Sequence, residues 1–507
     1  MKILTVDKIR EADLYTIRNE PIADIDLMER AANACFSWLI EHIPNHKKIR
    51  ICCGTGNNGG DGMAVARLMA TQGYSTEVFL FGSPEVLSPT CRINFGRLSG
   101  IPGLTCKIIS EDEQLPVFHP DEDIIIDALF GSGLNRPVTG TLAKVIRHIN
   151  DQSSITIAID VPSGLFCDET VAGSKDPAII RADSTLTFSP PKLAFFFPEN
   201  DRFVGDWHLL DIGIHPGYLE KAETSTHLIT PQDCARILKR RNKYSHKGTF
   251  GHACLLCGSK GKMGAAVLAA KACLRSGAGL VTVHIPRSGI VILQTAVPEA
   301  MLLQDEDEDI ISGIPDLSSY SSIAAGPGIG MADSTMRALK HLIQNSTLPV
   351  ILDADALNIL GENKTWIPFV PKGSIFTPHP KEFERLAGKS KDDFDRNRIQ
   401  REFSVKYGIY VILKGAHTAI TTPGGECYFN STGNPGMATG GSGDVLTGIL
   451  AGIMAQGYSS LETCLLGVYI HGLAGDFAEE ETGQEALIAS DIIRHLGNAF
   501  LSIYGEF

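Results

Sequence analysis

A glycine-rich segment near the carboxyl end of the chain combines residue types that suit phosphate chemistry. It spans 433–446 and reads GNPGMATGGSGDVL. Glycines let a backbone turn tightly and present its amides to an anion, and an apolar helix over 445–454 would follow. Asp444 would repel a phosphate unless it took a proton from a hydroxyl that attacks the phosphoryl group. We therefore predict that Gly443 and Asp444 lie in a phosphoryl-transfer site, with a plain loop capped by Asp444 as the structural alternative.

Three loops of the first half carry polar residues directly after short apolar stretches. GTGNNGGDG follows residues 49–53 and precedes a helix that we expect to begin near Met63. Such a glycine fingerprint alone is weak evidence for a dinucleotide site. Asp127 ends the next stretch and leads into the loop FGSGLNRPVTG, and Asp160 opens DVPSG after a third. Ligands bind beyond the carboxyl ends of strands in open α/β sheets, so these loops predict one polar pocket in preference to separate helix caps.

The elements that would position these loops alternate between strands and helices. Both halves interleave short apolar stretches with helical stretches of ten or more residues, which is typical of parallel α/β sheets. In the first half the predicted strands are 49–53, 76–81, 123–127, 155–160 and 184–188. In the second half they are 253–257, 280–285, 322–325, 350–353, 374–377 and 411–414.

A change of composition near the middle of the chain separates two domains. At 507 residues the chain is too long for one ordinary core. The alternating pattern gives way to a segment rich in proline and aromatic residues, then to a polar stretch, and a fresh helix start follows at Thr230. We predict a first domain over 1–215, a linker over 216–229 and a second domain over 230–507.

Composition narrows the partners and the compartment. The net charge of −13 and the lack of a dense basic cluster argue against nucleic acid and anionic membranes as partners. The amino-terminal residues lack the apolar core of a signal peptide, and no stretch reads as a membrane span, so we expect a cytoplasmic protein. The twelve cysteines are scattered, and the pair Cys254 and Cys257 has no second pair at zinc-finger spacing. We predict that they pack in the core, in preference to zinc or redox chemistry at the Cys254–Cys257 pair.

Taken together, the motifs resemble those of a known family. GTGNNGGDG, DALFGSGLNRPVTG and DVPSG resemble the NAD(P)H-hydrate epimerase domain of the bifunctional NAD(P)H-hydrate repair enzymes. The second half resembles their ADP- or ATP-dependent (S)-NAD(P)H-hydrate dehydratase domain through KMGAA, AAGPGIG, LDADALN, TPHPKEF, KGAHT and GNPGMATGGSGD. The resemblance runs from about Lys8 to about Leu496. It implies an N-terminal Rossmann-like, three-layer parallel sheet and a C-terminal ribokinase-like α/β domain.

For the first domain, the resemblance implies an epimerase site. Asp160 would be the acid/base near C6 of the hydrated nicotinamide, and its place at a strand end suits proton transfer to a ring held over the sheet. A potassium ion would be bound by Asn58, Asp127 and Ser163, whose oxygen atoms suit a hard cation that offsets the negative charge of the pocket. The implied dinucleotide-binding residues are Asn57, Asn58, Gly59, Gly60, Asp61, Gly131, Ser132, Gly133, Leu134, Asn135, Arg136 and Pro137.

For the second domain, it implies a dehydratase site in which Asp444 is the general base. Mg²⁺ would accompany ADP, with help from Asp353 and Asp355 or with these two residues as helix caps instead. His379 alone would be a core histidine, but its position after a strand and between two prolines favours a ligand contact. The implied contacts to hydrate and nucleotide are Ala265, Gly328, His379, Lys414, Gly415, Ala416, His417, Thr418, Gly443 and Asp444.

Two departures and two alternatives accompany this resemblance. Thr55 stands where the family usually has proline, and His417 and Thr418 fall where the family varies and nucleotide preference could change. The main alternative is a ribokinase-like small-molecule kinase with a non-catalytic Rossmann-like interaction domain. A scaffold protein is the other, although such relatives lose the acids that this chain keeps. The single-chain arrangement favours ADP over ATP as phosphoryl donor, and relatives suggest a homo-oligomer.

Overall fold

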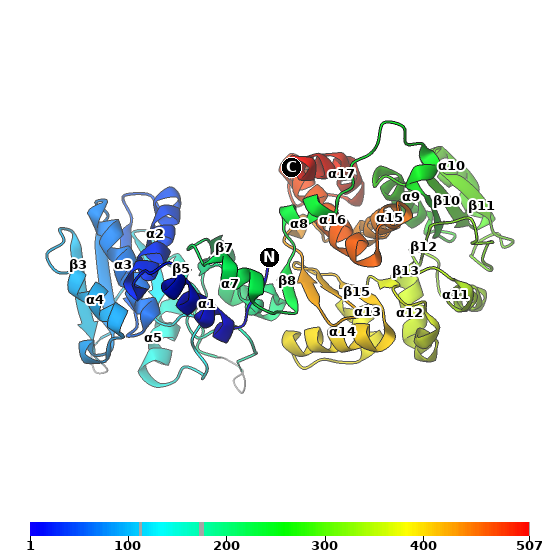
Figure 1. The fold of residues 1–507 in the computed structure, drawn as a ribbon. Helices are drawn as coiled ribbons and strands as arrows, with labels where there is room; N and C mark the ends of the chain where they lie inside the picture. Colours follow the sequence, from blue (N-terminus) through cyan, green and yellow to red (C-terminus); the bar gives the residue numbers. More distant parts are fainter. Residues whose placement is uncertain (111–113, 172–176, 506–507) are drawn as a thin grey trace. The chain divides into compact units, whose positions relative to one another are not determined.

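The chain folds into two units that each contain a sheet covered by helices (Figure 1). The computed structural model describes residues 1–110, 114–171 and 177–505. One unit runs from Lys2 to Thr224, and the other begins at Ser225 and includes Met1. The predicted fold class, a parallel-sheet first domain and an α/β second domain, is confirmed.

The N-terminal unit contains a seven-stranded, fully parallel sheet made of β1 (Lys48–Cys53), β2 (Thr76–Phe81), β3 (Leu104–Ile109), β4 (Asp123–Ala128), β5 (Thr156–Ile159), β6 (Ser184–Phe188) and β7 (Asp206–Leu210). The strand order is β3-β2-β1-β4-β5-β6-β7. The order reverses between β1 and β4, and a crevice forms at the carboxyl edge of a parallel sheet at such a point. The register places Cys52 of β1 opposite Asp127 of β4.

Both faces of this sheet are covered by helices, which are α1 (Val6–Asn19), α2 (Asp24–His42), α3 (Asn57–Thr71), α4 (Pro89–Arg97), α5 (Gly140–Asn150), α6 (Asp201–Val204) and α7 (Pro216–Lys221). One face packs with α2, α3 and α4 around residues such as Ile51 and Ile126. The other face packs with α5 around Ile125. Strand β4 is buried on both faces, and four of its six residues are apolar. The other two are Asp123, which is ion-paired with Arg50, and Asp127.

The C-terminal unit contains a ten-stranded sheet made of β8 (Thr226–Leu228), β9 (His252–Leu256), β10 (Leu280–Ile285), β11 (Met301–Gln304), β12 (Ser322–Ala325), β13 (Val350–Leu352), β14 (Ile375–Phe376), β15 (Tyr410–Leu413), β16 (Ala419–Thr421) and β17 (Cys427–Phe429). The order is β11-β10-β9-β12-β13-β14-β15-β16-β17-β8. From β11 to β15 the neighbours are parallel, whereas β16 is antiparallel to both β15 and β17.

Two helical layers enclose this second sheet, and its helices are α8 (Pro231–Ile237), α9 (Met263–Arg275), α10 (Ile290–Ala296), α11 (Asp333–Asn345), α12 (Ala354–Glu362), α13 (Pro380–Ala387), α14 (Asp393–Tyr407), α15 (Ser442–Ala455), α16 (Ser460–Thr482) and α17 (Ala489–Tyr504). The layer with α9, α15, α16 and α17 shares one apolar core with the sheet. The layer with α11, α12, α13 and α14 shares the other. Helix α15 is therefore packed between the sheet and its neighbouring helices, which fixes its amino-terminal end.

The stretch 216–229, predicted as a linker, contains regular structure. The division between the two units falls inside it, after Thr224. However, α7 packs against α1 in the first unit, and β8 pairs with β17 in the second. The polar composition of this stretch concealed a helix and a strand that are each too short to show a hydrophobic period.

The predicted strands are all present, and none of their ends differs from the prediction by more than one residue. Six further strands were missed. Of these, β3 is an edge strand whose middle four residues are exposed, so it lacks the apolar run of a buried strand. The strands β8, β16 and β17 have three residues each. The prediction that the cysteines pack in the core holds for eleven of them, which are buried, and is wrong for Cys106, which is exposed.

Two helices begin earlier than the sequence predicted, and both begin inside glycine-rich segments. Helix α3 begins at Asn57 instead of near Met63. Its first turn packs closely on the preceding loop, where a Cβ atom at Gly59 would lie 2.0 Å from the carbonyl oxygen of Gly54. Helix α15 begins at Ser442, after Gly441 with a φ of 95°. Asp444 therefore lies in the first turn of α15 and is not its N-cap.

Two candidate active sites

The N-terminal unit contains a cavity of about 530 Å³ where the loops after β1, β4 and β5 meet. This is the point at which the strand order reverses, as expected for a ligand site in an open α/β sheet. The structure thus brings the three predicted loops together. The predicted residues that line the cavity are Asn57, Asn58, Asp61, Gly131, Ser132, Gly133, Leu134 and Asp160.

Five predicted dinucleotide-binding residues do not line this cavity in the described part of the chain. Gly59 and Gly60 face the protein interior, where Asn94 Nδ2 donates to the carbonyl oxygen of Gly60 at 3.2 Å. The others, Asn135, Arg136 and Pro137, follow Leu134 in the loop after β4. Their contact with a dinucleotide stays a prediction.

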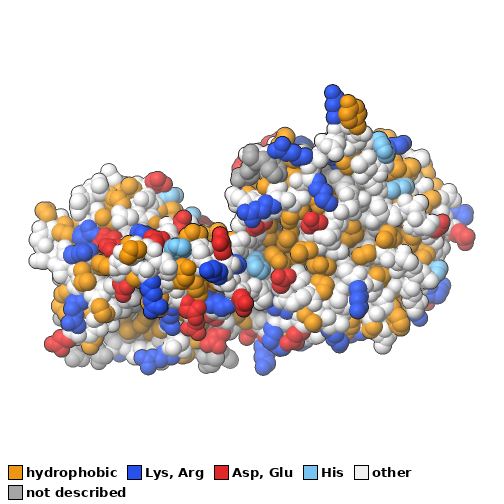
Figure 2. Space-filling view, viewed as in Figure 1, with side chains coloured by type: hydrophobic (Ala, Val, Ile, Leu, Met, Phe, Trp, Pro, Cys, Tyr) orange, Lys and Arg blue, Asp and Glu red, His pale blue; other side chains and the backbone are white. Residues whose placement is uncertain are grey.

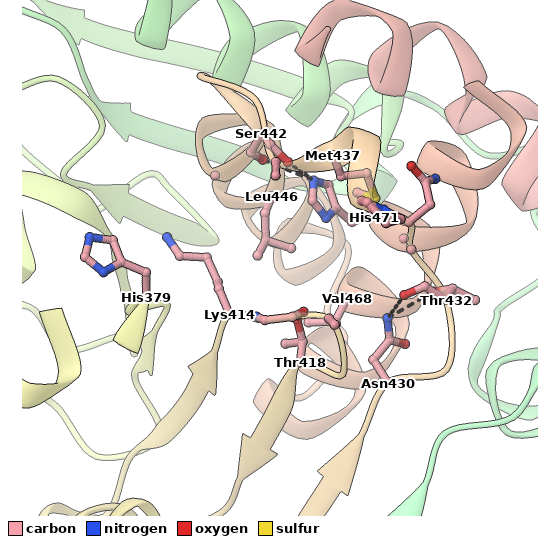
Figure 3. Close-up of a pocket in the computed structure, with 18 residues that line it drawn as sticks. His379, Lys414, Thr418, Asn430, Thr432, Met437, Ser442, Leu446, Val468 and His471 are labelled. Carbon is pink, nitrogen blue, oxygen red and sulfur yellow. Dashed lines mark hydrogen bonds between the residues drawn. The ribbon is translucent and has the colours of Figure 1, made fainter. Parts of the chain in front are cut away.

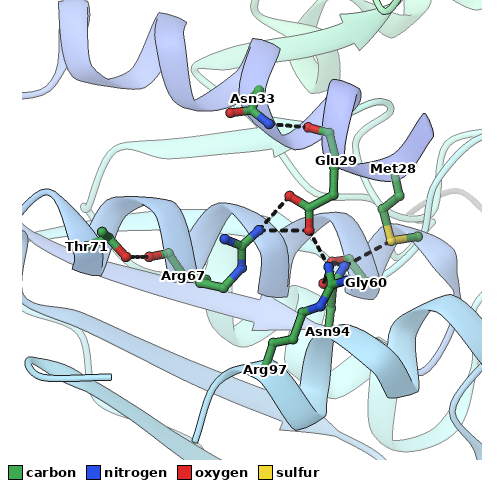
Figure 4. Close-up of polar contacts among 8 residues, drawn as sticks. All are labelled: Met28, Glu29, Asn33, Gly60, Arg67, Thr71, Asn94 and Arg97. Carbon is green, nitrogen blue, oxygen red and sulfur yellow. Dashed lines mark hydrogen bonds and ion pairs between the residues drawn. The ribbon is translucent and has the colours of Figure 1, made fainter. Parts of the chain in front are cut away.

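Helix α3 is held in place by ionic contacts with the two neighbouring helices (Figure 4). Glu29 of α2 accepts hydrogen bonds from Arg67 of α3 at 2.5 and 2.8 Å and from Arg97 of α4 at 2.6 Å. Asn94 of α4 reaches the backbone of Gly60 from the same side. These contacts fix the first turns of α3, which carry Asn57, Asn58 and Asp61 into the cavity.

Asp160 forms a buried ion pair with Lys192, a residue that the sequence analysis did not identify. Lys192 is 1% exposed, and its Nζ lies 2.5 Å from Asp160 Oδ1. The same ammonium donates to Phe188 O at 2.7 Å and to Thr187 Oγ1 at 3.0 Å. Burial alone would raise the pKa of Asp160, but the charge of Lys192 and its hydrogen bond outweigh burial and the pKa is lowered. Asp160 is therefore ionised at neutral pH.

The backbone at Asp160 is strained. Its φ is 64°, a region that residues with a Cβ atom rarely occupy. The N–H of Val161 donates to the carbonyl oxygen of Ile159 at 2.8 Å, which closes a three-residue turn centred on Asp160. The N–H of Ser132 donates to Asp160 Oδ2 at 3.1 Å and holds the carboxylate toward the loop after β4. Strain of this kind persists where surrounding contacts over-determine the conformation, as they do here.

The predicted cation ligands Asn58, Asp127 and Ser163 meet around the backbone of Phe130. Asn58 Nδ2 donates to Phe130 O at 2.9 Å, and Ser163 Oγ lies 3.2 Å from the same oxygen. Ser163 also donates to Asp127 through its N–H at 2.8 Å and its hydroxyl at 2.6 Å. Burial raises the pKa of Asp127 to about 6 against these hydrogen bonds. The buried Oδ1 of Asn58 has no hydrogen-bond partner among the described residues, so one oxygen of the set is available to a cation.

The C-terminal unit contains a cavity of about 610 Å³ beside the amino-terminal end of α15 (Figure 3). It is bounded by the loop after β15, the GNPGMATGGSGD segment and α16. The predicted residues that line it are His379, Lys414, Gly415, Ala416, Thr418 and Gly443. The phosphate loop predicted after β15 and the glycine-rich segment therefore face one another across a single cavity.

Lys414 is fixed at one wall of this cavity by Asp353. Its Nζ lies 2.9 Å from Asp353 Oδ1, and Thr447 Oγ1 donates to Asp353 Oδ2 at 2.8 Å. Asp353 is thus an ion-pair partner and makes no side-chain cap for α12. A Cβ atom at Gly443 would lie 3.3 Å from Lys414 Nζ, so the glycine lets this ammonium approach the first turn of α15.

Asp444 lies next to this ion pair in the first turn of α15. Burial, then the charge of Asp353, raises the pKa of Asp444 to about 6, while Lys414 opposes the shift. Asp353 thus supplies a second carboxyl group near the first turn of α15. A carboxylate with this pKa is a stronger base than an ordinary aspartate, yet it is mostly ionised at neutral pH.

Two histidines line the same cavity in different states. His379 is the N-cap of α13, where its Nδ1 accepts from the N–H groups of Lys381 and Glu382 at 3.1 and 3.3 Å. In Figure 3 its ring lies beside the ammonium of Lys414. His471 of α16 is half-buried, and loss of solvation lowers its pKa to about 4, while its Nε2 lies 3.0 Å from Ser442 O. His471 is therefore neutral and holds the start of α15.

Four predicted contacts, Ala265, Gly328, His417 and Asp444, are not among the described residues that line this cavity. Ala265 and Gly328 are neighbours, since a Cβ atom at Gly328 would lie 3.2 Å from Ala265 Cβ. Asp355 connects their two segments by accepting from Gly330 N–H at 2.8 Å and from Lys262 Nζ at 3.2 Å. His417 lies on the loop after β15, where its Nδ1 is 3.3 Å from Asn430 O. Contact of these residues with a ligand stays a prediction.

The visible surface carries both signs of charge. In Figure 2, acidic and basic side chains are interspersed over the N-terminal unit on the face shown. Among the helices that the structure describes, none combines the length and apolarity needed to cross a membrane.

Comparison with known proteins assigns the chain to a family. The family described as NAD(P)H-hydrate dehydratase matches residues 253–498, and the one described as YjeF-related protein N-terminus matches residues 24–194. A bifunctional NAD(P)H-hydrate repair enzyme of Thermofilum pendens is 33% identical over 100% of this chain and 98% of its own. Its counterpart in Moorella thermoacetica is 34% identical over 98% of this chain and 96% of its own. The chain belongs to the bifunctional NAD(P)H-hydrate repair enzymes.

This membership of the NAD(P)H-hydrate repair enzymes confirms the predicted family and enzyme class. These relatives match the chain over both units. The alternative of a kinase joined to a non-catalytic interaction domain is therefore not supported. A solved structure of ADP/ATP-dependent NAD(P)H-hydrate dehydratase from Bacillus subtilis, co-crystallized with ATP/Mg²⁺, is also similar. It is 29% identical, with a TM-score of 0.47, and the match covers 55% of this chain and 98% of that one.

Three residues that the sequence analysis missed belong to these sites of the repair enzyme. Lys192 is a lone lysine in the apolar run SPPKLAFFFP, and an isolated charge in such a run is a signal that could have been used. Asp13 lies on an amphipathic helix, and His471 on an apolar one. Neither position stands out in the sequence, because each becomes part of a site only through packing.

The ion pair leads to a test of stability in the N-terminal unit. Lys192→Met should lower the free energy of unfolding of this unit by about 3–5 kcal/mol, because it leaves the carboxylate of Asp160 buried without its cation. Lys192→Met combined with Asp160→Asn should recover much of that loss. Native-state hydrogen exchange of the β5 and β6 amides in the full chain measures both variants. An additive double variant would show that the two side chains are energetically independent.

Proposed function

We propose that the N-terminal site interconverts the R and S epimers of hydrated NAD(P)H. We propose further that the C-terminal site dehydrates the S epimer to NAD(P)H at the expense of ADP, which gives AMP and phosphate. Hydration at C6 of the nicotinamide ring forms a hemiaminal that cannot donate hydride. The two activities together would return either epimer to the pool of reduced cofactor.

The observation that carries this proposal is the position of Asp444 beside the Lys414–Asp353 pair in the first turn of α15. The C6 hydroxyl is a poor leaving group and must be converted to a phosphate ester. Asp444 would take the hydroxyl proton as the oxygen attacks the terminal phosphorus of the nucleotide. Lys414 and the amino-terminal end of α15 would stabilise the negative charge on the transferred group.

The same arrangement explains why phosphate need not remain on the product. Once the C6 oxygen carries a phosphoryl group, the lone pair of N1 can expel it as inorganic phosphate, and loss of a proton from C5 restores the ring double bond. A sugar alcohol has no such nitrogen and would keep its phosphate. The chemistry of the hemiaminal thus separates a dehydratase from a kinase that uses a similar site.

Mg²⁺ would accompany the nucleotide. Both carboxylates that could hold it are already engaged, Asp353 by Lys414 and Thr447, and Asp355 by Lys262 and Gly330 N–H. Mg²⁺ commonly keeps several waters and is bound largely through phosphate oxygens. We therefore propose that the ion is held mainly by the phosphates of ADP and that it neutralises their charge beside Asp444.

In the N-terminal site, Asp160 would exchange a proton with the hydrate at C6. The Lys192 ammonium keeps this carboxylate ionised, and the Ser132 N–H points it toward the loop after β4. The amides of Gly131, Ser132 and Gly133 would hold the dinucleotide. The cavity gives Asp160 access to a ring placed over the carboxyl edge of the sheet.

We propose potassium as the cation of the N-terminal site. The unpartnered Asn58 Oδ1 and the oxygens of Asp127 and Ser163 fit a hard monovalent ion. The ion would offset the charges of the neighbouring carboxylates and fix the loop geometry. Without it, these three residues would serve as a hydrogen-bonded brace around Phe130.

Three further expectations follow the resemblance. ADP is the expected phosphoryl donor, because the fusion of both domains in one chain resembles the bacterial arrangement. A homo-oligomer is expected from relatives, and the cytoplasm is the expected compartment. Size measurement in solution and parallel assays with ADP and ATP test the first two.

Asp444→Asn should reduce dehydration about 10²–10⁴-fold, since it removes a well-placed general base. Epimerisation should be unaffected, because that site lies in the other unit. Dehydration is followed by the absorbance of reduced nicotinamide with prepared S hydrate and ADP. In the wild type the rate should also fall as the pH drops below about 6, because protonation of Asp444 removes the base.

The matched control is Asp316→Asn, which changes an exposed aspartate of the same unit. It should keep wild-type rates of both reactions. An Asp444→Asn variant with nearly full dehydratase turnover would exclude Asp444 from the mechanism.

Asp160→Asn should stop the conversion of the R epimer while dehydration of purified S hydrate continues. The amide cannot accept the proton that the carboxylate takes. Chiral chromatography of the hydrates after incubation measures the conversion. Equilibration at the wild-type rate would mean that another group moves the proton.

Removing potassium should slow epimerisation or weaken hydrate binding in the wild type, and Asp127→Ala should weaken binding in a way that added potassium does not restore. Without the ion, Asp127 and Asp160 would repel the diphosphate of the substrate, and without Asp127 the ion would lose one of its ligands. Titration of hydrate at several potassium concentrations measures the effect. An epimerase indifferent to potassium over a wide range would leave Asn58, Asp127 and Ser163 as a structural brace.

A further inference from the structure

Helix α1 supplies a carboxyl group to the N-terminal cavity. Asp13 lines the cavity that also contains Asp160 and Lys192. The same helix touches the loop after β4, because Arg10 donates to the carbonyl oxygen of Gly133 at 3.2 Å. The N-terminal helix is therefore part of the wall of the site.

The position of α1 is fixed by packing on both sides of Asp13. Ala12 is fully buried in a small core with Leu27 of α2 and Ile212 after β7. One turn later, the Thr16 hydroxyl accepts from the N–H of His215 at 2.9 Å. Asp13 is thus presented by a rigid element, as a group that transfers protons requires.

Five ionisable residues line this cavity among the described residues: Arg10 and Asp13 from α1, Asp61 from α3, Asp160 from the end of β5, and Lys192. Lys192 contacts Asp160 directly at 2.5 Å. Burial, then the charge of Asp160, raises the pKa of Asp13 to about 7, and Lys192 opposes this. Around neutral pH, Asp13 therefore holds a proton in a large share of molecules, while Asp160 is a carboxylate.

We propose that Asp13 is a second catalytic residue of the epimerase, donating a proton to the C6 hydroxyl while Asp160 accepts one. The inference rests on the proposed epimerase function. Inversion at one carbon needs an acid for the hydroxyl that leaves one face of the ring and a base for the water that returns on the other. Two carboxyl groups can fill these roles when their environments give them different pKa values.

The reaction balances with water as the only co-reactant. The C6–O bond breaks as Asp13 gives its proton to the leaving oxygen, which departs as water, and the lone pair of N1 forms an N1=C6 double bond. Water then adds to the opposite face of C6, the electron pair returns to N1, and Asp160 takes the released proton. The reverse direction uses the two groups in exchanged roles, and exchange with solvent resets their protons.

Asp61 is the other acid that could donate. Burial, followed by the charges of Asp160 and Asp13, raises its pKa well above the usual range. It lies on α3 within the segment that the resemblance assigns to dinucleotide binding. We assign it to binding, so Asp61→Asn should act mainly on KM, whereas Asp13→Asn should act mainly on kcat.

The test follows epimerisation of purified R hydrate by the full chain in H₂¹⁸O. Wild type should incorporate one ¹⁸O at C6 for each inversion. Asp13→Asn should lower kcat roughly 10²–10⁴-fold and lower ¹⁸O incorporation in parallel, with dehydration of S hydrate unchanged. The matched control is Asp7→Asn on the same helix, whose side chain is 87% exposed, and it should behave as wild type.

The outcomes separate this inference from the proposed function. A wild type without epimerase activity would overturn the proposed function itself. If the wild type is active and Asp160→Asn is not, but Asp13→Asn keeps wild-type kcat, Asp13 is not the donor. Inversion without ¹⁸O uptake would instead show that the C6–O bond survives, and loss of uptake in Asp61→Asn alone would assign the donor to Asp61.

Discussion

Each unit pairs one lysine with one buried aspartate at the carboxyl edge of its sheet, and the lysine is fully buried in the first unit and partly exposed in the second. The pairs are Lys192 with Asp160 at 2.5 Å and Lys414 with Asp353 at 2.9 Å. Removing two charges from water is costly, and the cost is offset only when geometry is good and the remaining polar atoms are hydrogen-bonded. Here Lys192 also donates to two oxygens of β6, and Asp353 also accepts from Thr447. Each ion pair therefore depends on the polar groups that the edge of its sheet supplies. In turn, each pair fixes the loops that form the cavity of its unit.

These fixed charges divide the neighbouring acids into two kinds. Asp160, in contact with Lys192, has a lowered pKa, whereas burial raises the pKa of two nearby aspartates, to about 7 for Asp13 and about 6 for Asp444. In the dehydratase the second kind suits a base, because Asp444 is mostly ionised at neutral pH yet holds a proton more tightly than an exposed aspartate. In the epimerase both kinds are used, since inversion needs a donor and an acceptor together.

The fold could be predicted where strands are buried on both faces. Such strands are short apolar runs, as in β4 and β12, and each was found. The strands that were missed have a different physical basis. Edge strands such as β3 need no apolar face toward a neighbour, and three-residue strands such as β16 are specified by their partners. The starts of α3 and α15 were also misplaced, because glycines that allow close packing of a helix look the same in sequence as glycines that form a loop.

The sites could be predicted where the constraint is local. A Cβ atom at Gly443 would lie 3.3 Å from Lys414 Nζ, so the position favours glycine. Constraints of this kind on the backbone are visible in the sequence as a glycine motif. The charged side chains that pair with the site residues form no such sequence motif, because any position that packs near the cavity can supply them. Lys192 and Asp13 come from an apolar run and from an ordinary amphipathic helix, far from the glycine-rich loops. The loops give each cavity its shape, while residues from other elements set its protonation, and this second property emerges only when the chain is folded.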